Sequence, residues 1–559
     1  MEISHTLLLK KKSTLEAMRK DRLPFWHHWR DLGKMYLPRR YIHLATTPES
    51  RQSDRRNKSI LDSTGTVAAR VLASGMMNGI TSPSSHWFKL RLAGFGKDEP
   101  KEMRVWLDQV ESELLKIMAG SNFYNAIAVM YLDLVLFGTS AMLIYEDFKS
   151  VIRCFNPALG QFYFAQSNRQ QVNTFAREFT FKVHQVVEEF GLENCSEHVK
   201  LQYKRGGAHL QGDIKIVHLV EPNIQNERLV AKDFEFRELY WEMASQEKSR
   251  ILRAKGFHEL PGLFPRWDVS GNEAYGGCPA MDALGDVIQL QHETKAKGMS
   301  LDKMNDPPIQ ADIQLQHKPT ALMPRGITYV SGLLNSSGAA MRPVYQINPP
   351  IAEITQDIQQ LRSRIETVFH NDLFKLISNL DTVRSALEVD ALKSERLVQL
   401  GPVLERFENE ALDPGINRTF SIAQRNGLLP PVPEGFEDQE IEIQYESILS
   451  TAQRAAGTAS TERFFQVIGE VSAIHPSAKN VANFDVLLTE YGRDIGVAAT
   501  GMNTLEEIEE LNAADNAVAQ AAQEAEIGNQ VAQGAETLSN ADVGGGVNAL
   551  EVLAGGGTI

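Results

Sequence analysis

Two long helical segments in the second half of the chain constrain the fold most strongly. They are predicted over 279–304 and 351–373 and are separated by proline-, glycine- and serine-rich sequence with short strands such as 327–330. The first segment is bounded by GGCP before it and NDPP after it. Its apolar face (Met281, Leu284, Val287, Ile288) is followed by the polar residues Gln291 and Thr294, so its second half is the weaker helix prediction. Two long helices therefore flank a small segment that contains β-strands.

The composition is that of an ordinary globular protein. The chain has 559 residues, 43% of them apolar and 23% charged, which suggests three or four domains' worth of material and excludes a fibrous or wholly disordered protein. Its net charge of −14, from 57 basic and 71 acidic residues, argues against a surface that grips nucleic acid as a whole. Any DNA contact must be local or weak.

Targeting and redox signals are absent from the sequence. Three cysteines are too few and too scattered for a disulfide framework or a metal site, which favours a reducing compartment (Cys154, Cys195, Cys278). The first residues have the wrong order for a signal peptide, and the longest apolar stretch, 126–137, contains Asp133 and is too short to span a membrane. A soluble protein is expected.

Charge is distributed unevenly along the chain. Residues 1–60 carry 14 basic and 6 acidic side chains, a net of +8, whereas residues 501–559 carry 10 acids and no lysine or arginine. The two ends could meet different neighbours, although a solvated helix face and a solubilising tail explain the same pattern. From about Ala513 the sequence is rich in Ala, Gln, Glu, Asn and Gly, and we expect it to be frayed or disordered.

The first half reads as an α+β domain with a meandering sheet. Helices are predicted over 13–35, 62–80, 102–118 and 124–136, with Pro24 dividing or kinking the first and small residues lining the second. Strands are predicted over 86–92, 140–145, 151–155, 174–183, 214–220 and 234–241. Helix dominates the carboxyl-terminal half, with a long helix over 381–412 and two or three more over 445–497.

No catalytic constellation is found in the sequence. There is no phosphate-binding GxxxxGK[ST] loop, no HExxH and no GxSxG, and the cluster at Gly94–Lys97 lacks the required spacing and hydroxyl residue. His27 and His28 lie between two tryptophans, where aromatic packing explains them better than metal binding. The acids are too numerous for a catalytic pair to be selected among them.

Three stretches, in the same order, resemble the portal or head-to-tail connector proteins of short-tailed (podovirus-type) bacteriophages. They are RRNKSILDSTGTVAARVLASGMMNGITSPSSHWFKLRL (55–92), GGCPAMDALGDVIQLQHETKAKGMSLDKMNDPPIQA (276–311) with the PRG turn at 324–326, and EVDALKSERLVQLGPVLERFENEALDPGINRTFSIAQRNGLLP (388–430). The resemblance covers roughly residues 10–500.

The resemblance implies a mostly helical α+β portal fold that assembles as a ring of twelve copies, with wing, stem, clip and crown. Carried onto this chain, the parts are: wing, 1–278 and 381–440; stem helices, 279–304 and 351–373; clip, 305–350; channel loop, 374–380; crown, 441–513. Residues 514–559 match no family motif, and the expectation of a disordered acidic tail rests on composition alone.

The implied function is structural: a channel at one capsid vertex for packaging and ejecting double-stranded DNA. The implied partners are further copies of the chain, the major capsid and scaffolding proteins, the terminase large subunit (the packaging ATPase), the tail adaptor protein and DNA bound without sequence specificity. Neither a cofactor nor a membrane is expected. The implied location is the virion, after assembly in the host cytoplasm.

Helix geometry permits such a channel. A ring of twelve helices packed about 10 Å apart encloses a bore of roughly 28 Å, which is wide enough for a DNA duplex about 20 Å across. A ring of eight such helices would have a bore of only about 16 Å. A channel must let DNA slide through without binding it tightly, and the excess of acidic residues is consistent with such weak binding. The candidate cations that guide or retain DNA are those of the stem and the adjacent loop: Lys295, Lys297, Arg362, Arg364 and Lys375.

These cations alternate with acids on both stem helices, so for a monomer ordinary mixed surface charge is the better explanation. Two other functions remain open at this point. The first is a DNA-packaging or DNA-processing enzyme, which the missing phosphate-binding loop disfavours. The second is a helical assembly or adaptor protein without a DNA channel.

Overall fold

The computed structural model describes the greater part of the chain. The described residues are 5–41, 44, 60–94, 100–223, 230–243, 251–305, 309–311, 341–343, 349–372, 400–433, 435, 441–445, 464–471, 475, 483–484, 486–488, 491 and 505–539. Contacts divide the chain into two units. The first comprises 1–89, 110–430 and 443–450, and the second comprises 90–109, 431–442 and 451–559.

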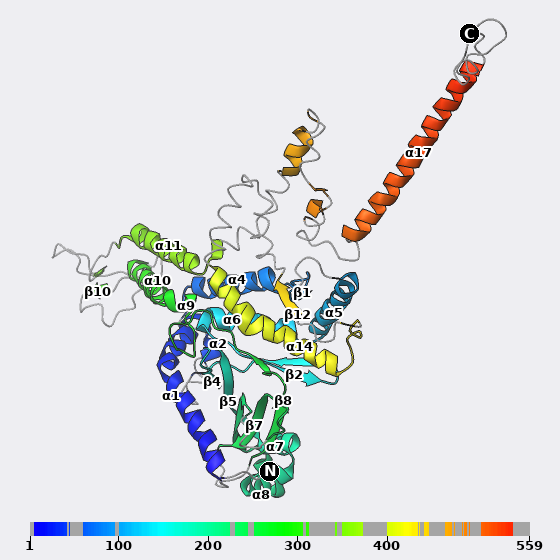
Figure 1. The fold of residues 1–559 in the computed structure, drawn as a ribbon. Helices are drawn as coiled ribbons and strands as arrows, with labels where there is room; N and C mark the ends of the chain where they lie inside the picture. Colours follow the sequence, from blue (N-terminus) through cyan, green and yellow to red (C-terminus); the bar gives the residue numbers. More distant parts are fainter. Residues whose placement is uncertain are drawn as a thin grey trace, which may run out of the picture. The chain divides into compact units, whose positions relative to one another are not determined.

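The helical core of the first unit is built from α1 (His5–Tyr36), α4 (Thr64–Ile80) and α6 (Phe123–Phe137) (Figure 1). Small buried residues of α4, such as Ala69, allow close approach to α6, most of whose residues are buried. The predicted helices over 62–80, 102–118 and 124–136 are confirmed, the second as α5 (Lys101–Gly120). Pro24 does not divide α1, which is one helix of 32 residues.

The predicted meandering sheet is confirmed. Five antiparallel strands neighbour one another in chain order: β4 (Phe162–Gln166), β5 (Val172–Lys182), β6 (Asp213–Pro222), β7 (Phe236–Glu242) and β8 (Arg253–Phe257). Apolar residues of α1, including Leu15 and Met18, pack with Val217 and Trp241 on one face. On the other face, α7 (Val183–Phe190) and α8 (Glu197–Arg205) contribute to a second apolar cluster with Ile216 and Tyr240, so this end of the sheet is also covered.

A smaller sheet joins segments that lie far apart in the sequence. It contains β2 (Met142–Asp147), β3 (Val151–Phe155) and β9 (Gly262–Leu263), and α14 (Asp413–Arg425) packs against all three. Of the helix predicted over 381–412, residues 400–407 are helical and 408–412 form a π-helix that leads into α14, whereas 381–399 lie outside the described residues. The described residues also form the short helix α2 (Pro38–Tyr41), the 3₁₀ helices Leu192–Asn194 and Gly207–Gln211, and the strands β1 (Phe88–Leu92) and β12 (Ile441–Tyr445).

Both predicted long helices are present. The first is α9 (Pro279–Asp282) followed by α10 (Leu284–Asn305), and the second is α11 (Ile351–Val368). Short strands β10 (Ile309–Ala311) and β11 (Met341–Pro343) pair antiparallel, so the chain between the helices contains a small β-structure as expected. The strand predicted over 327–330 lies outside the described residues.

The second unit contains a helix where we predicted disorder. Residues Leu505–Ser539 form α17, and their described side chains are exposed apart from Ile508 and Gly534, which are half-buried. The prediction was wrong for 514–539 because it considered only the lack of apolar side chains to bury. Alanine, glutamate and glutamine are strong helix formers, and their intrinsic preference favours a helix without a packed face.

Two classes of site are absent from the described ranges. No helix there is both long and apolar enough to cross a bilayer. Nor does any group of three or more histidine, cysteine or acidic side chains lie close enough together to hold a metal ion. All three cysteines are buried and free.

The buried carboxyl group of Asp133 makes the stability of the first unit depend on pH. Burial raises the pKa of Asp133 from 3.8 to about 6, although its ion pair with Arg40 of α2 lowers it. Between about pH 4 and 6 the folded state therefore holds a proton that the unfolded state has lost, so the stability falls as the pH rises through this range.

We expect Asp133→Asn to abolish this slope. Relative to the variant, the unchanged protein should lose a few kcal/mol of unfolding free energy between pH 4 and 6, about 1.4 kcal/mol per pKa unit. Urea unfolding of both proteins at matched concentration and several pH values measures the difference. Parallel pH profiles would show that Asp133 keeps its ordinary pKa.

Candidate functional site: a two-helix stem and its anchor

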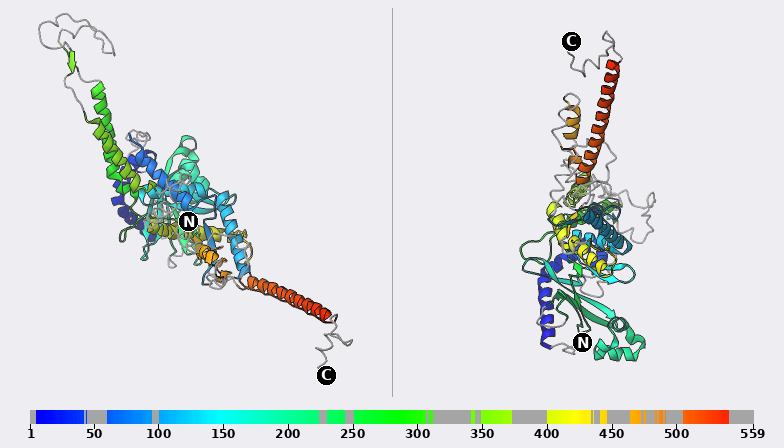
Figure 2. Two further views of the ribbon diagram at one scale, coloured as in Figure 1. Left: turned by 90° about the horizontal axis from the view of Figure 1, so that it is seen from above. Right: turned by 45° about the vertical axis from the view of Figure 1, so that its right-hand side comes forward.

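Helices α10 and α11 run antiparallel, side by side (Figures 1 and 2). Two contacts fix their register. Near the base of the pair, Nη2 of Arg364 donates to Oδ1 of Asp286 at 2.6 Å, and further along Nζ of Lys297 donates to Oγ1 of Thr355 at 2.8 Å. The two helices are about 33 and 27 Å long, from their 22 and 18 residues. We refer to this pair as the stem.

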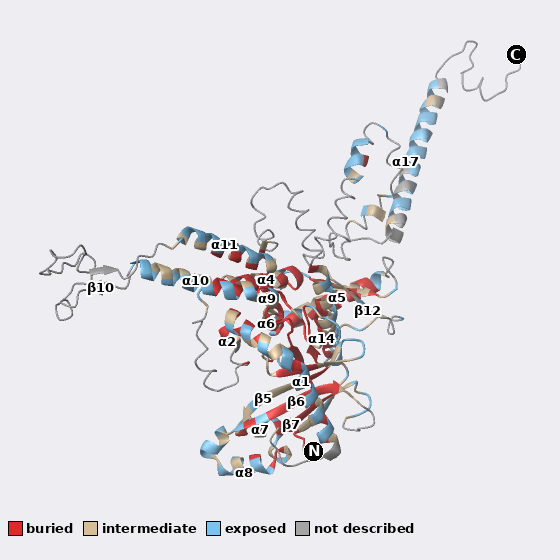
Figure 3. Cartoon of the chain, turned by 90° about the vertical axis from the view of Figure 1, so that its left-hand side faces the viewer, coloured by how far each residue is buried: buried red, intermediate tan, exposed pale blue. Residues whose placement is uncertain are grey.

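Only the base of the stem is buried in the single chain. Its buried residues are Val287, Leu290 and Gln291 on α10 and Ile358, Leu361 and Ile365 on α11. Every residue of 292–305 and 351–357 is at least partly exposed, and Met299 and Met304 are 49% and 43% exposed (Figure 3). Apolar surface on the far half of the stem is thus left exposed by the described residues of a single chain.

Asp62 anchors the base of the stem to α4. Its Oδ1 accepts hydrogen bonds from the backbone N and Oγ1 of Thr64 at 2.9 and 2.6 Å, and its Oδ2 accepts from Nε and Nη2 of Arg362 at 3.0 and 2.8 Å. Burial would raise the pKa of Asp62, but the hydrogen bonds from Thr64 and Arg362 outweigh it and hold the pKa below its ordinary value. The ionised carboxylate therefore bridges α4 and α11.

Gln291 ties α10 into the same anchor. Its Oε1 accepts from the backbone N atoms of Leu61 and Asp62 at 2.7 and 2.9 Å, and its Nε2 donates to the backbone O of Asp62 at 2.8 Å. All of these polar groups have partners, as burial requires. The polar residue that weakened the helix prediction is thus the attachment of that helix to the body of the first unit.

Close packing at Gly65 completes the base. A Cβ atom at this position would lie 3.0 Å from Cε1 of Tyr36 and 3.0 Å from Cγ2 of Val287. The Tyr36 hydroxyl donates to the backbone O of Ala280 at 3.1 Å. Helices α1, α4, α9 and α10 therefore meet at a place where a Cβ atom would require its neighbours to shift by a few tenths of an ångström.

The cations predicted to face DNA lie in different environments. Lys295 is exposed, and among the described residues it has no ion-pair or hydrogen-bond partner. Lys297 bonds Thr355, Arg362 bonds Asp62 and Arg364 bonds Asp286, as described above. Lys375 lies outside the described residues. Sequence reasoning missed Asp62, Gln291 and Gly65, although a glutamine on an apolar helix face was a usable signal.

Comparison with known proteins places the chain in a family. A family model described as bacteriophage head to tail connecting protein matches residues 10–503. The portal protein of Salmonella phage epsilon15 is 36% identical over 529 residues, and the probable portal protein of Bordetella phage BPP-1 is 33% identical over 528 residues. Each alignment covers 94% of both chains. The chain belongs to the bacteriophage head-to-tail connector family.

This membership confirms the resemblance seen in the sequence and decides one of the open alternatives. Members of this family are structural connectors, so the chain is a structural protein and not a DNA-packaging or DNA-processing enzyme. Its functional parts are therefore contact surfaces and the residues that position them, rather than catalytic groups.

Replacing Asp62 with asparagine should loosen the stem. We expect Asp62→Asn to lower the unfolding free energy by about 1–3 kcal/mol at neutral pH, because Arg362 and Thr64 lose a charged acceptor. The contribution of the carboxylate should be present at neutral pH and disappear on acidification below about pH 4, since its pKa is depressed in the folded state. Thermal or urea unfolding measures both effects.

Arg364→Gln is the matched control, because it removes the other stem ion pair. Arg364 is 64% exposed, so this change should cost less than about 1 kcal/mol. Equal losses for the two variants would contradict the anchoring role of Asp62.

Proposed function

We propose that the chain is a portal protein whose copies close into a ring, with the stem as the wall of a channel for double-stranded DNA. The carrying observation is the stem itself: two antiparallel helices fastened at one end by Asp62 and Gln291, and exposed at the other. Apolar groups such as Met299 and Met304 then become buried against neighbouring copies. Membership in the connector family supports this reading.

The dimensions permit twelve copies. A wall of twelve helices about 10 Å apart leaves a bore of roughly 28 Å for a duplex about 20 Å wide, and eight leave too little room. In this proposal the ring occupies one capsid vertex of the virion, after assembly in the host cytoplasm. Its clip, 305–350, meets the terminase large subunit during packaging and the tail adaptor protein afterwards, and its wing meets the major capsid and scaffolding proteins.

Imaging the purified protein by electron microscopy tests the assembly. We expect rings with a central hole wide enough for a duplex, with twelve copies as the commonest count. A strictly monomeric protein under all assembly conditions, or a ring too narrow for a duplex, would reject the channel. A ring-free helical assembly would favour the remaining alternative, an adaptor without a DNA channel.

Among the four candidate cations of the stem, the proposal gives Lys295 the main contact with DNA. Lys297, Arg362 and Arg364 already have partners within the chain, which weakens their pull on phosphates. A few unpaired cations among many acids provide guidance without strong retention, because each phosphate that is neutralised adds salt-dependent affinity. Lys375 stays a candidate beside the proposed channel loop.

Lys295→Ala in assembled particles should reduce DNA retention and make it less sensitive to salt, because one ring of phosphate contacts is lost. The amount of packaged DNA after a salt challenge is the measurement. Lys204→Ala is the control, since this lysine is exposed in the last turn of α8, outside the stem. Packaging and retention that are unaltered by the Lys295 change would remove this residue from the channel.

A further inference from the structure

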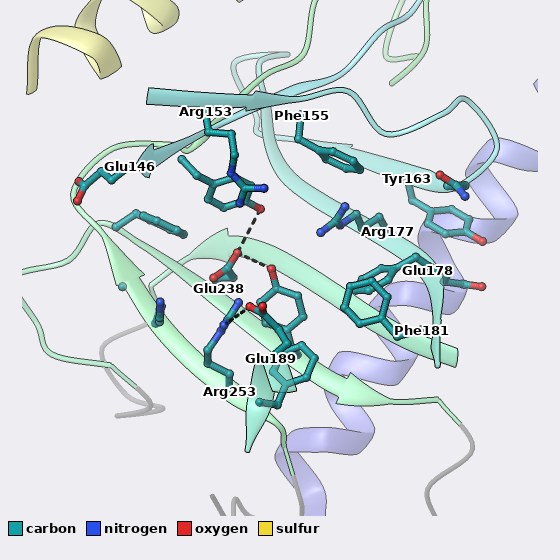
Figure 4. Close-up of a pocket in the computed structure, with 18 of the residues that line it drawn as sticks. Glu146, Arg153, Phe155, Tyr163, Arg177, Glu178, Phe181, Glu189, Glu238 and Arg253 are labelled. Carbon is teal, nitrogen blue, oxygen red and sulfur yellow. Dashed lines mark hydrogen bonds and ion pairs between the residues drawn. The ribbon is translucent and has the colours of Figure 1, made fainter. Parts of the chain in front are cut away.

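A cavity of about 1320 Å³ lies within the first unit, outside the stem (Figure 4). Its floor includes Arg177, Tyr240 and Arg253, which belong to one cross-strand row of the five-stranded sheet together with the buried His218. Arg153 and Phe155 of β3 point into the same space from another wall. Nothing in the stem proposal uses this cavity.

The charges that line the cavity do not balance. Eight lining side chains are lysine or arginine and four are glutamate, a difference of +4 in a chain whose net charge is −14. Each glutamate has a partner: Glu146 with Arg425, Glu178 with Arg19, Glu189 with Arg253, and Glu238 with His218. Within the described part of the chain, five lining cations have no carboxylate partner: Arg22, which donates to the backbone O atoms of Gly160 and Phe162, and Arg153, Arg177, Lys215 and Lys255.

Contacts with three side chains hold the guanidinium of Arg177 in place. Its guanidinium lies 4.7 Å from the ring centroid of Phe155 and 4.5 Å from that of Phe179, and its Nε donates to Nδ1 of His218 at 3.0 Å. Nε2 of His218 in turn lies 2.8 Å from Oε1 of Glu238, which also accepts from the Tyr240 hydroxyl at 2.9 Å.

The supports of Arg177 are themselves buried. His218 is 0% exposed and Glu238 is 2% exposed. Burial lowers the pKa of His218, so the imidazole is neutral and its Nδ1 can accept the hydrogen bond from Arg177. The contacts from Glu238 through His218 to Nε of Arg177 therefore fix one edge of the guanidinium of Arg177. Its two terminal amino groups remain available to an external carboxylate. Such fixed forks bind carboxylates in two-point geometry.

We propose that this cavity is a docking site for an acidic polypeptide segment of another phage protein, whose carboxylates pair with Arg177 and Arg153 and whose apolar side chains enter the aromatic lining. Ten of the lining residues are aromatic, which provides apolar contact beside the cations. The site is independent of the stem, so its failure would leave the channel proposal untouched, and the reverse holds too.

Size and charge select this occupant over others. The volume exceeds the roughly 300–1,000 Å³ that is usual for a small-molecule pocket, as a peptide segment requires. A DNA duplex, about 20 Å wide, is too thick to enter a cavity of this volume. The four lining glutamates would also repel a row of phosphates, whereas a peptide can place single carboxylates at the unpaired cations.

Peptide binding to the purified protein tests the chemistry of the site. The probe is a short fluorescent peptide of glutamate and phenylalanine, compared with a counterpart in which glutamine replaces glutamate. Fluorescence anisotropy should show tighter binding of the glutamate peptide, weakened by salt. Arg177→Gln and Arg153→Gln should each reduce its affinity about tenfold, as expected for loss of one charge-assisted contact.

Two variants guard against misfolding as an explanation. Arg153 is exposed, so its replacement should leave the fold intact, and Arg205→Gln on α8, outside the cavity, should leave binding unchanged. Equal binding of the two peptides, or equal effects of Arg153→Gln and Arg205→Gln, would overturn the proposal.

Cross-linking in assembled particles identifies the source of the segment. Thr180, an exposed residue of the cavity lining, is replaced with a photoreactive amino acid, and the cross-linked peptide is sequenced by mass spectrometry. An acid-rich peptide from another particle protein is the expected product. A peptide from a second copy of this chain, a cross-link to DNA, or no cross-link at all would each refute the assigned occupant.

Discussion

The ionised carboxylate of Asp62 is the constraint on which the described part of the stem depends. It is nearly buried, yet both oxygens are saturated by donors from Thr64 and Arg362, while Gln291 binds the backbone on either side of it. One short segment before α4 thus orients α10 and α11 together. Helices whose far halves bury little surface in a single chain need such a fixed base, because surface contacts alone hold two long helices weakly.

The rest of the first unit uses the same device to join distant parts of the sequence. Arg266, only 3% exposed, donates to both carboxylate oxygens of Glu410, 144 residues away, and Arg418 of α14 pairs with Glu259. A buried charged pair contributes little net stability, but removing one partner is costly. These pairs therefore favour one arrangement of the segments over others. The cavity proposed as a docking site shows the complementary case, in which cations such as Arg177 are positioned but left without a carboxylate.

Much of the fold could be predicted from the sequence. Alternating and helical apolar patterns located the helices of the first half, the meandering sheet and both stem helices, because those patterns report directly which face is buried. The failures have physical causes. Pro24 lies within an unbroken α1, held by packing on both sides of it, and the alanine- and glutamate-rich α17 is helical through intrinsic preference. Strands β4 and β8 and the helices α7 and α8 were missed, since short elements carry weak periodicity.

The sequence by itself determined the family, the acidic balance, the absence of a phosphate-binding loop and the presence of two long helices around a small β-structure. Only the tertiary structure decided what individual polar residues do. Five stem and loop cations looked alike in the sequence, yet Arg362 binds Asp62, Arg364 binds Asp286 and Lys295 has no partner among the described residues. Periodicity in the sequence reveals which residues are buried, but the partners of Arg364 and Arg362 lie 78 and 300 residues away and are set by how the helices pack.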